Sequence, residues 1–192
     1  MLEEEYQSGH RPFGAHRNQP PLEVPFTYDI REVTPADLPD IRAIYNHYVA
    51  NSTVTFDETP MTLRELKLKY AQLGKLGLPF IVAVSPTGHV LGYAYVFPWK
   101  TKAAYRFTVE NSIYLGPAAT GKGLGKALMA ELIARSKAAG LKEIVAVIAD
   151  RGADASIRLH EAFGFKQIGH MGKVGFKFER WLGTVLMQKS LK

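Results

Sequence analysis

The stretch GPAATGKGLGKAL at residues 116–128 constrains the fold most, because it places a glycine-rich turn between a strand and a helix. The strand-like segment FTVENSIYL, residues 107–115, precedes it. Apolar residues at helical spacing follow from Leu124 to Ala139, and Gly140 ends that helix. Such a turn directs backbone N–H groups toward the helix N-terminus, where the helix dipole also favours anions. The sequence therefore predicts an α/β (α+β) architecture with a phosphate-binding turn.

The same loop is open to other readings. Glycines also serve plain tight turns, and residues 116–122 match the G-x-x-x-x-G-K part of a nucleotide-binding P-loop. Gly123, however, cannot supply the hydroxyl that a P-loop uses to bind magnesium. The loop also comes late, after three strands with an antiparallel pattern, although IVAVIAD ending at Asp150 imitates a Walker B strand. A dinucleotide-binding turn fits less well, because G-x-G-x-x-G is interrupted at Lys126.

The rest of the chain is interpreted as one domain, residues 28–192, behind a proline-rich segment. Residues 1–27 hold four of the 11 prolines and are expected to form a flexible tail. Periodicity and turn residues predict strands at 28–33, 78–85, 89–99, 107–115, 142–149, 165–171 and 184–189. They predict helices at 35–49, 62–77, 124–139 and 156–163, the first two opened by capping boxes.

Composition excludes several kinds of site. The chain has no cysteine, which rules out disulfides and thiolate chemistry. Its six histidines occur singly, so no metal site is expected. An N-terminus that reads MLEEE and the lack of a long apolar run predict a cytoplasmic protein with no membrane partner.

The net charge of +6 suits an anionic ligand. Four cations, Arg64, Lys67, Lys69 and Lys75, fall in one predicted helix. Aromatic residues do not interleave with them in the manner of a single-strand-binding surface, so they are interpreted as a solvated face, and no nucleic-acid partner is expected.

Several long motifs in order give a specific resemblance over residues 28–191. They are AIYNHYVANSTVTFDETPMT, YRFTVENSIYL, GKGLGKALM, VAVI, SIRLHEAFGF and VGFKFERW. In these motifs the chain resembles the GCN5-related N-acetyltransferase (GNAT) superfamily, and within it the phosphinothricin acetyltransferase-like amino-acid N-acetyltransferases. The resemblance implies a mixed, mostly antiparallel sheet of about seven strands, flanked by helices and splayed at an acetyl-CoA site. It also implies that the loop binds the pyrophosphate of acetyl-CoA through backbone amides, without magnesium.

Acetyl transfer to an amine has two physical demands. The ammonium must lose a proton, and charge developing on the thioester oxygen must be stabilised. Strand alternation puts Glu110 on the face opposite Val109 and Asn111, although a strand glutamate taken alone is most often just exposed. The resemblance implies that Glu110 is the general base. It also implies that His160, where many members of the superfamily have a tyrosine, protonates the leaving thiolate, whereas a lone helical histidine is usually structural or exposed.

The resemblance also implies the binding residues. Backbone near Ile113 is expected to hold the acetyl carbonyl and the pantetheine arm, and Lys122 and Lys126 either add charge for the phosphates or are plain surface lysines. The full expected cofactor set is Ile113, Tyr114, Leu115, Gly121, Lys122, Gly123, Leu124, Gly125, Lys126 and Ser156. An acceptor carboxylate needs cations or amide donors. The expected acceptor set is Phe56, Lys100, Lys102, Tyr105, Arg106, Val174 and Gly175.

Five positions depart from the family pattern. Thr120 stands where Gln or Arg is usual, Ala153 where Asn is common, Lys102 where Arg is frequent, and Glu179 and Gly183 where Gly and Asp are more usual. They bear on cofactor affinity and on the identity of the acceptor.

The predicted activity is acetyl transfer from acetyl-CoA to the α-amine of a small amino acid or analogue. Phosphinothricin and methionine sulfoximine or sulfone are the first acceptors to consider, and a homodimer is expected because relatives are commonly dimers. The alternatives are a polyamine or protein N-terminal acetyltransferase, a catalytically silent acyl-CoA-binding protein and, from a different class, a P-loop nucleotide enzyme.

Overall fold

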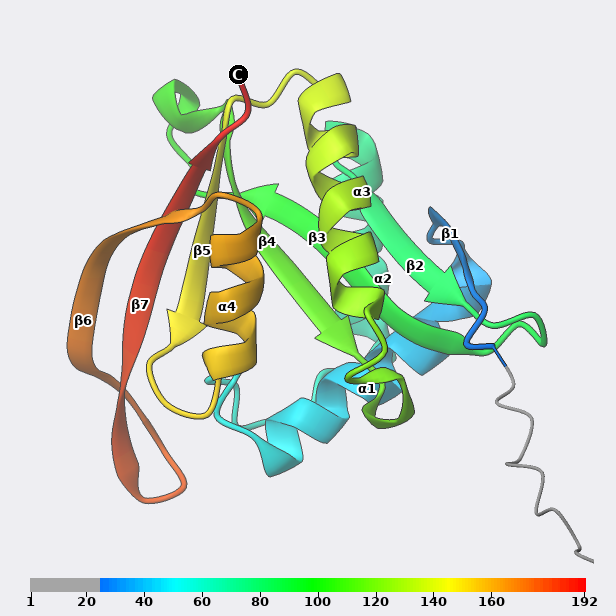
Figure 1. Cartoon of the computed structure of the whole chain (residues 1–192), viewed down its shortest axis with the longest axis horizontal. Coiled ribbons are helices and arrows are strands. Elements are labelled where there is room, and N and C mark those ends of the chain that lie inside the picture. The colour runs from blue at the N-terminus through cyan, green and yellow to red at the C-terminus, as the bar shows by residue number, and fades with distance from the viewer. Residues whose placement is uncertain (1–24) are drawn as a thin grey trace, which may run out of the picture.

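A seven-stranded open sheet with helices on both faces forms the body of the protein (Figure 1). The structure is a computed structural model, and it describes residues 25–192. The strands are β1 (Asp29–Glu32), β2 (Phe80–Val84), β3 (Val90–Pro98), β4 (Thr108–Leu115), β5 (Glu143–Ala149), β6 (Lys166–Lys177) and β7 (Arg180–Ser190). Their order across the sheet is β1-β2-β3-β4-β5-β7-β6. The predicted tail, residues 1–27, lies outside the described residues except for its last three.

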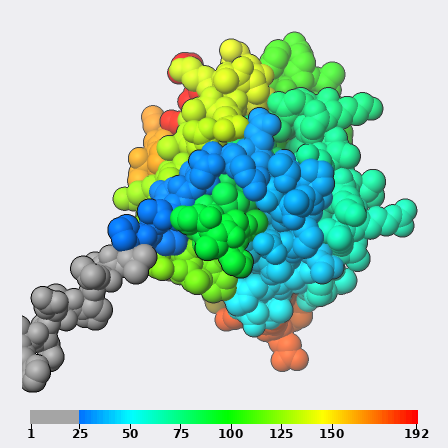
Figure 2. Space-filling model, turned by 90° about the vertical axis from the view of Figure 1, so that its right-hand side faces the viewer, coloured from blue at the N-terminus to red at the C-terminus, as the bar shows by residue number. Residues whose placement is uncertain are grey.

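Four helices cover the sheet. In Figure 1, α3 (Leu124–Ala138) and α4 (Asp154–Ala162) lie in front of it, and α2 (Leu63–Leu76) lies behind it. α1 (Leu38–Asn51) packs with α2 against β3 and β4. From the side shown in Figure 2, the first described residues and α1, drawn in blue, lie across that side of the molecule. Within residues 25–192, no helix is both long and apolar enough to cross a bilayer.

The central strands feed two separate cores. In β2 all five residues are buried, so the strand reads as a continuous apolar run, as expected for a strand covered on both faces. Ile81 and Ala83 join the core under α3, whereas Phe80 and Val82 join the core under α1 and α2. Alternate side chains therefore anchor opposite layers and fix the face on which each polar residue of β3 and β4 emerges.

Both predicted capping boxes are present. Thr34 and Asp37 open the 3-10 turn Pro35–Asp37 that leads into α1, and Thr62 and Glu65 open α2. The Arg31 guanidinium donates to both Asp37 carboxylate oxygens, at 2.7 and 2.8 Å. That pairing lowers the pKa of Asp37 to about 2. The entry to α1 is thus held by an ion pair as well as by its cap.

β4 and β5 separate after a short parallel ladder. Their pairing consists of Thr108–Glu143, Val109–Ile144 and Glu110–Val145. Beyond it β4 stays with β3 as far as Leu115, and β5 stays with β7 as far as Ala149, so the two ribbons diverge (Figure 1). The facing backbone edges of β4 and β5 are therefore without a strand partner after Glu110 and Val145.

The last third of the chain differs in length from the prediction. α4 begins at Asp154, two residues earlier than expected, and β6 and β7 extend to the tip of a long hairpin. Register shifts within β6 break the alternation that marks a strand. The hairpin turns at Phe178 and Glu179, which have φ of 51° and 57°, a conformation that usually takes Asn or Gly. The turn therefore carries no sequence signal.

Candidate active site

Glu110 lines a cavity of about 200 Å³ on the α2 side of the sheet. Glu110 and Ser112 project from β4 beside their β3 partners Phe97 and Tyr95, and Lys69 of α2 completes the lining. The predicted alternation of β4 is confirmed, since Val109 is buried in the opposite core. Burial raises the pKa of the Glu110 carboxyl, while Lys100 and Lys69 pull that pKa the other way. A carboxylate in such a cavity is suited to accept a proton.

His160 is buried on the other face of the sheet from Glu110. Its Nδ1 lies 2.7 Å from the Ser156 carbonyl, which can only accept, so Nδ1 carries the proton. Asn111 Nδ2 donates to Nε2 at 2.9 Å, and the ring packs against Phe165. Burial lowers the pKa of His160, which keeps the ring neutral. Both nitrogens are thus engaged, and donation to a thiolate, which stays a prediction, would require the Asn111 amide to move.

A pH dependence of stability follows from His160. Its folded-state pKa lies below the ordinary value of 6.5, so the unfolded chain takes up the proton first as pH falls. The stabilisation is complete above about pH 6.5 and is lost as pH decreases below it, by at most about 1.4 kcal/mol per pH unit. Urea unfolding at pH 5, 6 and 7 should show a shallower pH slope for His160→Gln than for wild type. Equal pH slopes for wild type and His160→Gln would contradict this role of His160. The control is His47→Gln, at an exposed histidine, which should keep the wild-type slope.

The glycine-rich loop leaves a row of backbone donors free. Gly121 and Gly123 have φ of 73° and 81°, and Gly123 is the N-cap of α3. Among residues 25–192, no acceptor is found for the amides of residues 121–125. A Cβ at either Gly121 or Gly123 would meet nothing within 4 Å, so the space in front of these amides is open. The predicted amide cradle therefore fits a pyrophosphate group at the N-terminus of α3.

The separated strands supply the second part of a fit for acetyl-CoA. The edges of β4 and β5 carry backbone groups with no strand partner, and the buried Asn111 Oδ1 lacks a hydrogen-bond partner within the described residues. Unpaired buried polar groups of this kind call for a ligand. Ala153, where relatives commonly have Asn, is the uncapped N-terminus of α4, and Ser156 lies one turn from His160. The predicted residues Ile113, Tyr114 and Leu115 lie on the diverging part of β4.

The predicted charged lysines of the loop are exposed. Lys122 Nζ lies 4.8 Å from the centroid of the Phe26 ring, and Lys126 sits in the first turn of α3. Leu124 is fully buried beneath the loop, and a Cβ at Gly125 would be in ordinary contact, 3.6 Å from the Leu159 side chain of α4. The Leu124 side chain therefore packs in the core, while the amides of Leu124 and Gly125 stay in the row of free donors and both lysines are exposed.

The predicted acceptor residues fall into two groups. Lys100, Lys102, Tyr105 and Arg106 form the exposed connection from β3 to β4, at the Glu110 end of β4. Phe56 contacts Gly175 of β6, where a Cβ would lie 2.5 Å from Phe56 Cε2. Glu110 is level with Gln188 of β7, whereas Gly175 pairs with Leu182, about 20 Å further along that strand at 3.3 Å per residue. Within one chain, Phe56, Val174 and Gly175 are therefore not brought to the Glu110 cavity.

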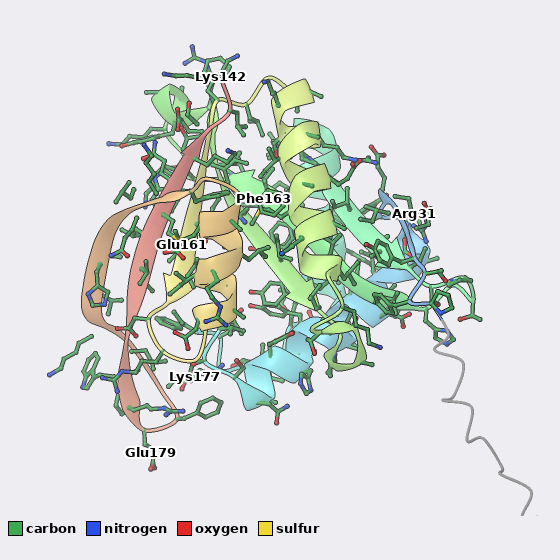
Figure 3. All side chains as sticks on the ribbon, in the orientation of Figure 1. Arg31, Lys142, Glu161, Phe163, Lys177 and Glu179 are labelled. Carbon is green, nitrogen blue, oxygen red and sulfur yellow. The ribbon has the colours of Figure 1, made fainter. Side chains whose placement is uncertain are left out.

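A buried lysine ties this second group together. Lys177 is 2% exposed, and its Nζ donates to the carbonyls of Ser52 and Thr55, at 2.8 Å each. Figure 3 shows Lys177 beside the segment that follows α1, with Glu179 at the hairpin tip. The segment between α1 and α2 is thus fixed to the β6–β7 hairpin.

Gly183, one of the departures, is approached by a carboxylate from the loop that follows β5. Asp150 follows β5, and its Oδ1 accepts from the Gly183 amide at 3.0 Å while Oδ2 lies 3.0 Å from His170 Nε2. A Cβ at Gly183 would overlap the Asp150 carboxylate. A carboxylate therefore occupies this place although the usual Asp is missing from β7.

The interpretation of the basic residues of α2 as a solvated face is wrong for Lys69. The Lys69 side chain is partly buried, whereas Lys67 is exposed. Lys69 Nζ donates to the Tyr95 hydroxyl at 3.2 Å. The cause is visible in the spacing, because Lys69 follows buried Leu66 by three residues and precedes buried Leu73 by four. Sequence analysis also did not propose three other residues that line the cavity, Tyr95, Phe97 and Ser112. The only sequence signal for them is strand alternation, which puts Ser112 on the same face of β4 as Glu110 and puts Tyr95 and Phe97 together on one face of β3.

Comparisons with known proteins agree with this geometry. A model of the Acetyltransferase (GNAT) family matches residues 41–165. Over 162 residues the chain is 44% identical to a phosphinothricin N-acetyltransferase of Alcaligenes faecalis, covering 84% of this chain and 82% of that protein. It is 43% identical over 162 residues to an L-methionine sulfoximine/L-methionine sulfone acetyltransferase of Pseudomonas aeruginosa, covering 84% and 94%.

A solved structure gives the same result. A GNAT superfamily phosphinothricin acetyltransferase from Sinorhizobium meliloti, in complex with AcCoA, superposes with a TM-score of 0.82 at 43% identity, covering 85% of this chain and 88% of that one. The chain therefore belongs to the Acetyltransferase (GNAT) family, and the predicted fold class is confirmed.

Proposed function

We propose that the protein transfers an acetyl group from acetyl-CoA to the α-amine of a small amino acid or analogue. The observation that carries this proposal is the position of Glu110, in a small cavity at the point where β4 and β5 separate. Phosphinothricin and methionine sulfoximine or sulfone are the acceptors that the relatives' activities suggest. The cavity of about 200 Å³ is smaller than pockets that hold drug-sized ligands, which suits a single amino acid.

Glu110 acts as the general base in this proposal. Acetyl-CoA, when bound, supplies an activated acetyl thioester. Glu110 accepts the proton of the acceptor ammonium, directly or through one water. Its raised pKa brings the carboxyl closer to neutral pH, where a base transfers protons most effectively.

The remaining residues bind and orient. Free amides of residues 121–125 hold the diphosphate, assisted by Lys122 and Lys126. The edge of β4 from Ile113 to Leu115, which has no strand partner on the β5 side, holds the thioester arm. His160 and Asn111 fix α4 against β4 beneath this edge. The exposed connection from β3 to β4 leads into the strand that carries Glu110, and its residues Lys100, Lys102, Tyr105 and Arg106 would provide cations and a hydroxyl for the acceptor carboxylate.

A second copy of the chain is the proposed partner. β6 is an edge strand, and the β6–β7 hairpin exposes several large apolar side chains, namely Ile168, Met171, Val174, Phe176, Phe178 and Trp181. Exposed apolar patches on edge strands favour association. A homodimer through this hairpin would cover the patch and could bring the partner's hairpin toward Glu110. Size-exclusion chromatography with light scattering should show a dimer, and Trp181→Asp should give a monomer. A monomeric wild-type protein would contradict the dimer.

We also infer a cytoplasmic location, which the absence of cysteine supports.

An acceptor panel tests the function. Thiol release from acetyl-CoA is followed with phosphinothricin, methionine sulfoximine, methionine sulfone, standard amino acids, spermidine and a short peptide with a free N-terminus. The protein itself gives no background, because it has no cysteine. Release with the amino-acid analogues is expected. Release only with spermidine or the peptide would contradict the proposed acceptor class, and coenzyme A binding without any release would support a silent binding protein.

A further inference from the structure

Lys69 and Glu110 place opposite charges on different walls of the same cavity. Lys69 projects from α2, and Glu110 projects from β4. No carboxylate lies within 4.0 Å of Lys69 Nζ among residues 25–192, and Glu110 likewise forms no ion pair there. The two groups are therefore held near each other without neutralising each other by direct contact.

Tyr95 fixes the position of the Lys69 ammonium. Lys69 Nζ lies 3.2 Å from the Tyr95 hydroxyl and 4.9 Å from the centroid of its ring. Tyr95 in turn is 9% exposed and packs against Phe80 and Tyr93 in the core under α1 and α2. An ammonium group has three donors, so at least two remain for a ligand in the cavity.

This arrangement is complementary to a particular acceptor. An amino acid whose ammonium meets Glu110 would turn its side chain toward Lys69 if its carboxylate meets the exposed cations of the β3–β4 connection. Lys69 is the only cation among the residues that line the described cavity. A phosphinate two methylene groups beyond Cα carries a negative charge for it, whereas a sulfone at the same place is neutral.

We propose that Lys69 is the specificity-determining residue of the acceptor pocket and selects acceptors that carry an anionic group at the end of the side chain. Phosphinothricin is then preferred over methionine sulfone. The inference rests on the proposed acetyl transfer to amino-acid acceptors, and it gives a role to a residue on α2 outside the catalytic strand.

The test compares two acceptors in charge-altered variants at pH 8. Lys69→Met should lower kcat/KM for phosphinothricin roughly 10- to 100-fold, the usual value of one hydrogen bond to a charged group, and lower it for methionine sulfone no more than about threefold. Lys69→Arg should retain most of the preference. Lys67→Met, on the exposed face of the same helix, is the matched control and should change neither value.

Binding separates this inference from the function itself. Calorimetric titration of the protein–coenzyme A complex with each acceptor should show the same loss of phosphinothricin affinity in Lys69→Met. Equal losses for both acceptors, or no loss for either, would overturn the role of Lys69. If wild type binds the acceptors but acetylates neither, the proposed function fails, and the ratio of the two affinities still decides the role of Lys69.

Discussion

Replacing Glu110 with Gln should lower turnover by roughly 10²–10⁴-fold, about 3–5 kcal/mol of barrier, while leaving acetyl-CoA affinity nearly unchanged. The carboxylate lies on the α2 face of β4, away from the amides of residues 121–125 that are expected to hold the diphosphate. The amide keeps the size of the side chain and removes only the ability to accept a proton. Steady-state kinetics with acceptor saturating and a separate titration with coenzyme A measure the two effects.

The pH profile adds a second readout. Because burial raises the pKa of Glu110, wild-type kcat/KM should rise with pH through a value above the ordinary 4.5, and the acid limb should be missing in Glu110→Gln. The contribution of Glu110 to the free energy of unfolding changes with pH in the opposite direction, decreasing as pH rises. A carboxyl with a raised folded-state pKa stabilises only in its protonated form, and this contribution is lost as pH rises past 4.5. Glu110→Gln should therefore not lower the melting temperature at pH 7. Exposed Glu161→Gln is the matched control, and unchanged turnover in Glu110→Gln would remove Glu110 from the mechanism.

Gly183→Ala should cost about 2–3 kcal/mol of stability, because one methyl group must fit where none can. Its Cβ would overlap the Asp150 carboxylate and lie 2.5 Å from the backbone carbonyl oxygen of Met171. The side chain of Asp150 can move only by giving up the Gly183 amide and His170, and the carbonyl belongs to the β6 backbone. Urea unfolding of the two proteins measures the difference.

Gly172 provides the control for this substitution. It lies on the same hairpin, and a Cβ there would meet nothing within 4 Å. Gly172→Ala should be neutral or slightly stabilising, since alanine loses less conformational entropy than glycine on folding. If Gly183→Ala were as stable as Gly172→Ala, the close packing of Asp150 against β7 would be wrong.

The elements that sequence reasoning found are those with local signals. The capping boxes at Thr34 and Thr62, the alternation that separates Glu110 from Asn111, and the glycine-rich turn before α3 all depend on neighbours within a few residues. The separation of β4 from β5 came with the family resemblance, and no pattern in either strand marks the residue at which the parallel ladder stops.

The features that were missed depend on partners far apart in the chain. His160 Nε2 accepts a hydrogen bond from Asn111, 49 residues away in the chain. The engagement of both ring nitrogens therefore could not be inferred from the sequence of the helix alone. Asp150 accepts a hydrogen bond from the amide of Gly183, which lies 33 residues later on β7. Lys69 is the instructive case, because the spacing of Leu66 and Leu73 already indicated its inward face, and only its charge favoured the surface.

The fate of the acetyl group tests the proposed acetyl transfer and the role of Glu110 together. Wild-type protein is incubated with phosphinothricin and acetyl-CoA carrying ¹³C in the acetyl carbonyl, and the products are followed by NMR and mass spectrometry. One molecule of phosphinothricin N-acetylated at the α-amine is expected for each thiol released, and almost none is expected with Glu110→Gln. Thiol release accompanied only by free acetate, or label on a group other than the α-amine, would contradict the proposed acetyl transfer.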